Sequence, residues 1–171
     1  MSTVDVVIGA GYGDEGKGLM TDYLASKGKS TVVRFNGGAQ ASHTVVRGIR
    51  HAFSHFGAGA LAGADTFLSK FFVVNPFLFK KEREVLHEKG VQLTTVAIDK
   101  ECLVTTPYDI ITNQLLEHVR DHQSHGSCGV GFGATIDRHE KNPSLTIKVS
   151  DMLCGEQYLR AKLDCIREEV S

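Results

Sequence analysis

The sequence predicts an α/β protein with a mostly parallel sheet flanked by helices, phosphate-loop-like, with a β-hairpin insertion. Short apolar runs alternate with amphipathic runs along the chain, which is typical of strands and helices that alternate around a parallel sheet. A glycine-rich loop joins the first apolar run to the first amphipathic run. The length of 171 residues predicts a single domain, large enough to bury about 70% of its unfolded surface.

The expected strands are short apolar runs. Residues 4–8 form a continuous apolar run rather than an alternating one, as strands buried on both faces do. Further strands are expected over 31–35, 71–74, 91–98 and 145–149. A hairpin that turns at Gly48 is expected over 45–53, and it is the insertion in the alternating scheme.

The expected helices are amphipathic runs over 16–27, 76–89, 107–122 and 155–169. Pro76 is suited to the first turn of the second helix, and Gly90 is suited to its end. In the first helix we expect one apolar face to point inward, and it consists of Leu19, Met20, Tyr23 and Leu24.

Composition narrows the class of ligand. The 19 basic and 20 acidic side chains give a net charge of −1, so no basic field is present to attract a nucleic acid. The four cysteines show neither C-x-x-C spacing nor a disulfide framework. No signal peptide and no apolar run of about 18 residues is recognisable. We therefore expect a cytoplasmic protein that binds small phosphorylated molecules, with no nucleic-acid partner and no membrane contact.

The glycine-rich loop carries the clearest chemical signal, and it reads Gly9-Ala10-Gly11-Tyr12-Gly13-Asp14-Glu15-Gly16-Lys17-Gly18. A strand, a glycine-rich loop and a helix together aim backbone N–H groups at a phosphate. Residues 11–18 fit the G-x-x-x-x-G-K pattern, but Gly18 stands where a Ser or Thr would hold Mg²⁺. Asp14 is then the candidate metal ligand, or a base, because a carboxylate beside phosphates needs a cation or a proton. The loop predicts both nucleotide binding and catalysis.

Two other interpretations of this loop compete with the first. The same residues match G-x-G-x-x-G, but the acidic ribose partner expected about 20 residues later is missing, so Lys17 favours a mononucleotide. A plain turn would be an odd use of four glycines, because each adds roughly 0.5–1 kcal/mol of entropic cost relative to alanine.

A second glycine-rich segment, residues 36–44, follows the second expected strand and contains a histidine. Because ligands bind at the carboxyl ends of parallel strands, this segment should lie beside the 11–18 loop. His43 could then act as a hydrogen-bond donor or general acid, although a histidine that caps the local turn fits equally well. His118, His122 and His125 have near-helical spacing but no acidic or cysteine partner at a fixed offset, so zinc is not expected there.

A third glycine-rich stretch, residues 126–135, follows the third expected helix. Its alternating glycines can bring backbone N–H groups close to an anion, or they can form a flexible connection. By itself this stretch decides nothing.

Three segments, in their order and spacing, together resemble the adenylosuccinate synthetase family. Residues 6–18 are similar to its signature loop, with G-D-E-G-K-G intact. Residues 34–46 are similar to its R-x-x-G-G-x-N-A-G-H-T-x-V segment, and residues 126–133 to its G-T-T-x-x-G-I-G loop. The resemblance runs from residue 4 to about 153. It implies one domain over 1–171 that corresponds to the N-terminal part of a synthetase, with the family's C-terminal part absent.

The resemblance implies an enzyme, a ligase that joins L-aspartate to carbon 6 of IMP. GTP, or ATP, phosphorylates the 6-oxygen, and adenylosuccinate is formed for purine biosynthesis. The partners implied are the nucleotide, IMP or a related purine monophosphate, and L-aspartate, with Mg²⁺ as cofactor. The implied assembly is a homodimer.

The resemblance also assigns residue roles. Asp14 would take the proton from purine N1 and ligate Mg²⁺, His43 would donate to the 6-oxygen, and the Ser42 carbonyl would be the second metal ligand. The implied nucleotide-binding residues are Gly13, Asp14, Glu15, Gly16, Lys17, Gly18, Ser42, His43 and Thr44. The implied substrate-binding residues are Asp14, Glu15, Gly16, Lys17, Gln40, Ala41, Ser42, His43 and Cys128.

Several positions depart from the family pattern. Gln40 replaces an asparagine at the purine, Cys128 replaces a threonine that contacts the substrate phosphate, and Ser42 replaces a glycine. Lys70-Phe71-Phe72 replaces a G-N-G turn. The arginine that the family sends across the dimer has no clear equivalent after Ala134, although Arg138 is nearby. Gln40 and Cys128 would suit a viral branch of the family that acts on dGMP. A third alternative is a catalytically inactive nucleotide-binding fragment.

Overall fold

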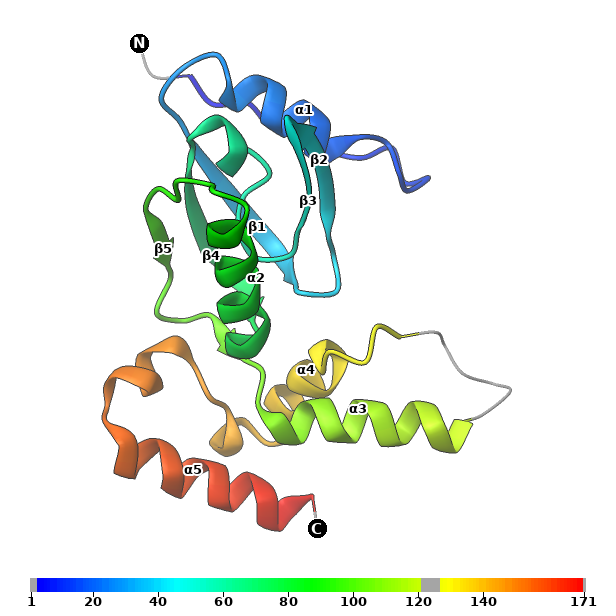
Figure 1. Ribbon diagram of the computed structural model, residues 1–171. Coiled ribbons are helices and arrows are strands. Elements are labelled where there is room, and N and C mark those ends of the chain that lie inside the picture. Colours follow the sequence, from blue (N-terminus) through cyan, green and yellow to red (C-terminus); the bar gives the residue numbers. More distant parts are fainter. Residues whose placement is uncertain (1–2, 121–126, 171) are drawn as a thin grey trace.

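The computed structural model describes residues 3–120 and 127–170, and it contains a sheet lobe and a helical lobe (Figure 1). Four strands, β1 (Thr31–Gly38), β4 (Asp65–Val74), β5 (Val96–Ile98) and β6 (Leu103–Val104), form a parallel sheet. The order is β1-β4-β5, and β6 pairs with the carboxyl end of β4. The predicted α/β class is confirmed, and the expected strands at 31–35 and 71–74 are neighbours in this sheet.

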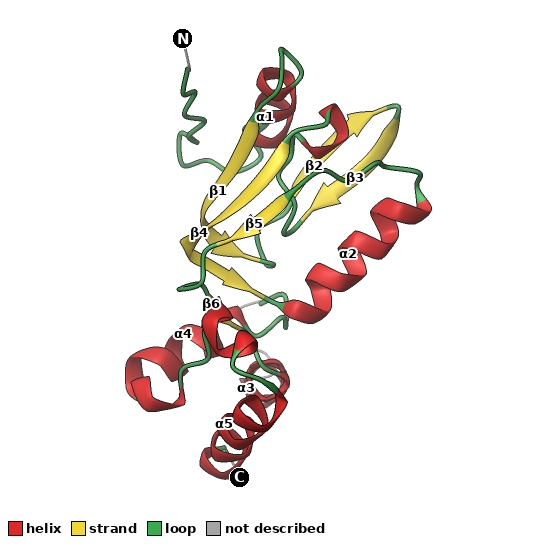
Figure 2. Cartoon of the chain, turned by 90° about the vertical axis from the view of Figure 1, so that its left-hand side faces the viewer, coloured by secondary structure: helices red, strands yellow, loops and turns green. Residues whose placement is uncertain are grey.

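The expected hairpin is present and lies beside the sheet (Figure 2). Strand β2 (His43–Arg47) pairs antiparallel with β3 (Ile49–Phe53), and Gly48 turns the chain with a φ of 69°. Helix α1 (Lys17–Ala25) packs on β2. The buried Asp22 carboxylate of α1 accepts hydrogen bonds from Arg47 at 2.9 to 3.2 Å, which anchors the helix to the hairpin.

The expected first strand is wrong. Residues 4–8 belong to no strand, and Val4 and Ile8 are 88% and 81% exposed. A β-branched apolar run favours a strand, but a strand also needs a ladder partner for its backbone. Within the described ranges β1 pairs with β4 alone, and nothing pairs with residues 4–8.

The expected inner face of the first helix is also wrong. Leu19, Met20 and Tyr23 are exposed and only Leu24 is half-buried, whereas Gly18, Asp22 and Ala25 are buried. The small residues allow a close approach. A Cβ built on Gly59 would lie 2.5 Å from the Ala25 Cβ, so the helix sits almost in backbone contact with the turn at η1 (Ala60–Ala62). Close packing of small residues therefore determined the helix face, rather than apolar periodicity.

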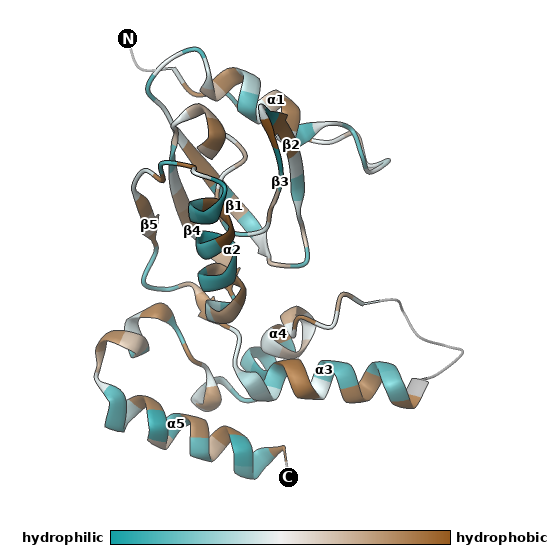
Figure 3. Ribbon diagram, viewed as in Figure 1, coloured by the Kyte–Doolittle hydropathy of each residue, from teal (hydrophilic) through white to brown (hydrophobic). Residues whose placement is uncertain are grey.

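The remaining helices are α2 (Pro76–Glu88), α3 (Pro107–Arg120), α4 (Phe132–Lys141) and α5 (Glu156–Glu169). Asn75 caps α2 by accepting a hydrogen bond from the Leu78 N–H at 3.1 Å. Helices at 76–89, 107–122 and 155–169 were predicted, whereas α4, which begins inside the glycine-rich stretch 126–135, was not. Figure 3 shows hydrophilic and hydrophobic residues alternating along α3 and α5, as amphipathic helices require.

Two further strand expectations need correction. The strand expected over 91–98 is confined to β5. No strand forms over 145–149: its ends belong to the 3₁₀ turns η3 (Pro143–Leu145) and η4 (Val149–Leu153), and residues 146–148 lie between these turns. Lys148 makes only a single antiparallel bridge to Leu103, because the Asp151 carboxylate accepts the Lys148 N–H at 2.8 Å and begins the second turn.

The hairpin and α2 enclose a buried acidic group. The Glu82 carboxylate accepts the N–H groups of Ser54 and His55 at 3.0 and 2.7 Å and the Ser54 hydroxyl at 2.6 Å. The His51 Nε2 lies 3.4 Å from it. Burial opposes its charge, but the hydrogen bonds from His55 and Ser54 hold the pKa of Glu82 below its ordinary value.

We expect stability to fall as the pH drops from 7.5 to 5.5. Burial lowers the pKa of His51, and burial with the charges of Arg34 and Lys17 lowers the pKa of His43. Both rings therefore take up protons more readily in the unfolded chain, so their stabilising effect is complete above pH 6.5 and is lost below it. Urea unfolding should show a shallower pH dependence for His51→Gln than for the exposed-site control His118→Gln. Equal slopes would contradict the prediction.

Candidate nucleotide site

The glycine-rich loop adopts a backbone that depends on its glycines. Gly11, Gly13 and Gly16 have φ values of 90°, 76° and 75°, and Asp14 has a φ of 47°. This left-handed region favours glycine, and aspartate is among the few other residues that enter it. Helix α1 begins directly after Gly16, and no side chain caps its first N–H groups. These N–H groups are therefore free to face an anion.

The Glu15 carboxylate folds back onto the backbone of the loop. Its Oε1 accepts the N–H groups of Gly11 and Tyr12 at 2.9 and 3.1 Å, and its Oε2 forms an ion pair with Lys17. The Lys17 hydrogen bond, followed by those from the two amides, lowers the pKa of Glu15 to about 2. The carboxylate is thus ionised at any working pH.

His43 lies against the first turn of α1. A Cβ built on Gly18 would meet the His43 Cβ at 2.9 Å, so glycine at this position lets the histidine approach the helix. Partial burial and the positive charges of Arg34 and Lys17 lower the pKa of His43. The imidazole is therefore neutral at pH 7 and can donate one ring N–H. Lys17, Gly18 and His43 are brought together, as the sequence predicted.

Arg34 holds the segment that carries His43, a role that the sequence analysis did not assign. Its guanidinium donates to the Ala41 carbonyl at 2.9 Å and to the Phe53 carbonyl at 3.4 Å, and it lies 5.0 Å from the centre of the Phe72 ring. Burial lowers the pKa of Arg34 to about 10. The sequence did contain a sign of this role, because Arg34 is a charged residue inside an apolar strand. A charged residue is buried only when it has partners.

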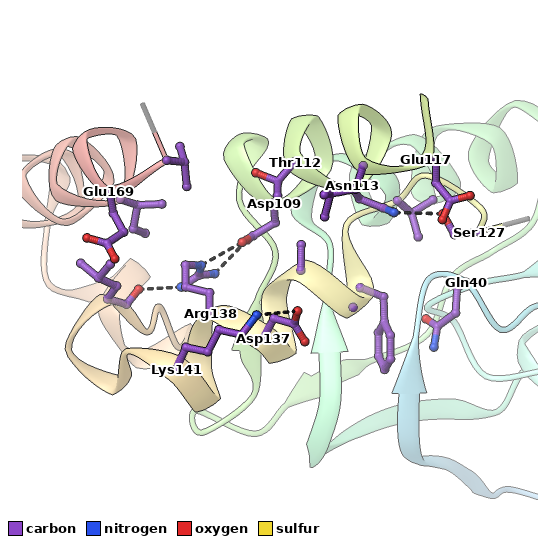
Figure 4. A pocket seen from close by; sticks show the side chains of 18 of the residues that line it. Gln40, Asp109, Thr112, Asn113, Glu117, Ser127, Asp137, Arg138, Lys141 and Glu169 are labelled. Atoms are coloured by element: carbon purple, nitrogen blue, oxygen red, sulfur yellow. Dashed lines mark hydrogen bonds and ion pairs between the residues drawn. The ribbon is translucent and has the colours of Figure 1, made fainter. Parts of the chain in front are cut away.

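A cavity of about 620 Å³ lies between the helical lobe and the carboxyl end of β1 (Figure 4). Gln40, Cys128 and Phe132 are among the residues that line it. The amide oxygen of Gln40 is buried and has no hydrogen-bond donor within the described part of the chain. A Cβ built on Gly38 would meet that oxygen at 3.0 Å and the Phe132 ring at 2.8 Å. Glycine at position 38 therefore lets Gln40 and Phe132 pack against the backbone at the end of β1.

Side chains of α3 hold the third glycine-rich loop. Asn113 donates to the Ser127 hydroxyl at 2.9 Å and accepts the Gly131 N–H at 3.1 Å, and Gln114 donates to the Gly129 carbonyl at 3.2 Å. This loop is therefore fixed against α3 from Ser127 onward, and Cys128 is presented at the cavity wall.

Arg138 is not available to reach another subunit. Its guanidinium makes two hydrogen bonds of 2.8 Å to the buried Asp109 and donates to the carbonyls of Leu145 and Val104 at 2.6 and 3.1 Å. Figure 4 shows it turned away from Gln40, toward Asp109. Arg138 therefore joins α4 to α3 and the neighbouring backbone.

The other predicted residues lie in the glycine-rich loop and in the segment that carries His43. Thr44 contacts the first turn of α1, with its carbonyl 3.4 Å from a Cβ built on Gly18. Asp14 and Ser42 are exposed, and Ala41 is tied down through its carbonyl. The residues described hold no group of three metal-ligating side chains. His122 and His125 lie outside the described residues. No described helix could cross a membrane.

A parallel sheet with a glycine-rich loop entering a helix defines an α/β protein of the phosphate-loop-like class. Residues 6–171 match the family model for adenylosuccinate synthetase. The synthetase of Dehalococcoides mccartyi is 33% identical over 168 residues, which are 96% of this chain and 38% of that protein. The synthetase of Prochlorococcus marinus is 36% identical over 161 residues, 92% of this chain and 36% of that protein.

Solved structures show the same fold. A fully ligated adenylosuccinate synthetase from Plasmodium falciparum superposes with a TM-score of 0.78 at 21% identity, covering 95% of this chain and 38% of that one. Cyanophage S-2L succinoaminodeoxyadenylate synthetase, bound to dGMP and dATP, superposes with a TM-score of 0.64 at 15% identity. The match covers 86% of this chain and 41% of that one. The chain belongs to the adenylosuccinate synthetase family, whose members are carbon–nitrogen ligases of purine biosynthesis. It spans less than two fifths of the length of these curated relatives.

Proposed function

We propose that this chain supplies the phosphate loop and the purine-activating residues of a ligase that joins L-aspartate to carbon 6 of IMP. The 6-oxygen of the purine attacks the γ-phosphate of GTP, and GDP leaves. The aspartate amine then attacks carbon 6, and phosphate leaves with the 6-oxygen. The observation that carries the proposal is His43 held against α1 beside Lys17, with its pKa lowered so that it is neutral.

In this proposal each residue at the loop has one task. Asp14 accepts the N1 proton, which makes the 6-oxygen a better nucleophile, and His43 donates a hydrogen bond to that oxygen. Lys17 and the loop N–H groups hold phosphate oxygens. Positioning and neutralisation of charge supply most of the rate in a phosphoryl transfer.

The residues present fit Mg²⁺. Within the described residues no hydrogen bond is made to the Asp14 carboxylate, which leaves both of its oxygens free, and the Ser42 carbonyl is the second proposed ligand. Hard oxygen donors suit this cation. Bound there, Mg²⁺ would neutralise phosphate charge. A homodimer in the cytoplasm completes the proposal, and sedimentation of the ligase would test the dimer.

A chimaera tests this proposal. Residues 3–170 replace the matching part of the Dehalococcoides mccartyi synthetase, which is 33% identical. We expect the folded chimaera to form the succinylated product from IMP, GTP and L-aspartate. A chimaera that folds, judged by circular dichroism and thermal melting, but forms no product would contradict the proposed function.

The unpartnered Gln40 oxygen favours a second candidate substrate, dGMP. A buried acceptor costs free energy unless a donor reaches it, and the 2-amino group of guanine is such a donor. A thiol at Cys128 is a poorer donor to a phosphate than a hydroxyl, so the purine monophosphate site differs at two places from the family pattern. The same chimaera, assayed with IMP and dGMP in turn, decides between the two substrates.

We expect the 171-residue chain alone to bind nucleotides weakly, with Mg²⁺ dependence and little preference for GTP over ATP. Lys17 and the loop N–H groups hold phosphates without regard to the base, whereas the base-reading part of the family pattern lies beyond the matched residues. Calorimetry with GTP, ATP and IMP checks this, and no aspartate ligation is expected. Product formation by the 171 residues would contradict it.

A further inference from the structure

We propose that the Glu15 carboxylate occupies the place of a phosphate in the ligand-free loop, so that an incoming phosphate must displace it. This inference rests on the proposed function, because it assumes that the loop is a phosphate site. It concerns the regulation of that site: the loop carries its own competing anion.

The geometry supports this assignment. One carboxylate oxygen accepts two successive backbone N–H groups, those of Gly11 and Tyr12, while the other is paired with Lys17. Convergent loop N–H groups and a lysine are the donors with which such loops bind phosphate oxygens. A carboxylate can satisfy the same donors. The site is therefore filled with an anion before any ligand arrives.

The backbone at Gly9 also lies close to this group. A Cβ built on Gly9 would lie 2.7 and 2.9 Å from the two carboxylate oxygens and 2.8 Å from the Lys17 Nζ. Glycine at this position leaves room for the ion pair against the backbone. The neighbouring Asp14 makes no hydrogen bond to the loop N–H groups that Glu15 uses. The two adjacent carboxylates are thus equal in charge but differ in contact, which provides a matched control.

Displacement predicts that removing the Glu15 side chain strengthens the binding of simple anions. Pyrophosphate, with EDTA present so that metal binding plays no part, is titrated into the wild-type chain and into Glu15→Ala and Asp14→Ala. We expect Glu15→Ala to bind about three- to fivefold more tightly, the scale of one exposed ion pair, and Asp14→Ala to gain less. Glu15→Asp keeps the charge but shortens the reach by one methylene, and it should also gain.

An NMR experiment reads the contact directly. The N–H signals of Gly11 and Tyr12 should move in Glu15→Ala and not in Asp14→Ala, and pyrophosphate should move the same two signals in the wild-type chain. If pyrophosphate binds but Glu15→Ala gains no more affinity than Asp14→Ala, charge repulsion alone explains the gain. The inference then fails, and the proposed function is unaffected. If no form binds pyrophosphate in EDTA, the inference is overturned. The proposed function, which expects Mg²⁺-dependent binding, is then judged by the calorimetry with GTP and ATP.

Discussion

Replacing Arg138 by alanine is expected to lower the free energy of unfolding by about 3–5 kcal/mol, the usual cost of breaking a buried ion pair. The Arg138 and Asp109 side chains are only 8% and 4% exposed, so the variant leaves a carboxylate buried without its countercharge. The Thr106 N–H and hydroxyl, at 2.7 and 2.9 Å from Asp109, compensate in part. The carbonyls of Val104 and Leu145 also lose a donor.

Urea unfolding followed by circular dichroism measures this effect, and the transition midpoint should fall by about 2 M for a denaturant slope near 2 kcal/mol per M. Lys141→Ala is the matched control. It removes a positive charge from the same helix, but its pair with Asp137 is exposed and should be worth less than about 0.5 kcal/mol. Similar losses in the two variants would show that Arg138 does not fasten the helical lobe.

The sequence predicted those features of the fold that local patterns determine. The hairpin turn at Gly48 and the capped start of α2 at Pro76 each depend on residues that are adjacent in the chain. The segment at 4–8 and the inner face of α1 depend on what lies opposite them, and there the predictions failed. Helix α4 was missed because its glycine-rich approach looks like a loop in the sequence. In the structure Gly131 packs closely against α3, since a Cβ built on it would lie 2.9 Å from the Ile110 nitrogen.

In the candidate site, too, some features could be predicted from the sequence and others could not. The sequence placed Lys17 and His43 together by expecting a strand before each loop, with both loops at one edge of the sheet. The two residues do lie close, but residues 4–8 form no strand, and the contact depends on Gly18, which lets His43 approach the first turn of α1. The sequence could not show that Glu15 turns back onto the loop, or that Arg34 reaches across to the Ala41 carbonyl. Both contacts depend on side-chain directions set by the backbone, in particular the left-handed residues between 11 and 16.

Asp14→Asn is expected to reduce ligation by the chimaera below detection. An asparagine can neither accept the N1 proton nor carry the charge that holds Mg²⁺. Loss of a positioned base alone costs about 10²–10⁴ in rate, and weaker metal binding adds to this. Asp5→Asn is the matched control, because it makes the same charge change at an exposed residue of the 3–10 segment and should leave turnover unchanged.

His43→Asn should lower turnover by about 10²–10⁴, less than Asp14→Asn, because asparagine keeps a donor but cannot match the position of the ring N–H. Burial and the charges of Arg34 and Lys17 lower the pKa of His43, and a protonated ring still donates an N–H. The wild-type rate should therefore not fall through His43 as the pH drops from 7.5 toward 6.5. Steady-state assays of the chimaera across this range, with the exposed-site control His118→Asn, measure both effects. Near-normal turnover in His43→Asn would rule out the role, since the ring beside Lys17 and Gly18 would then serve packing alone.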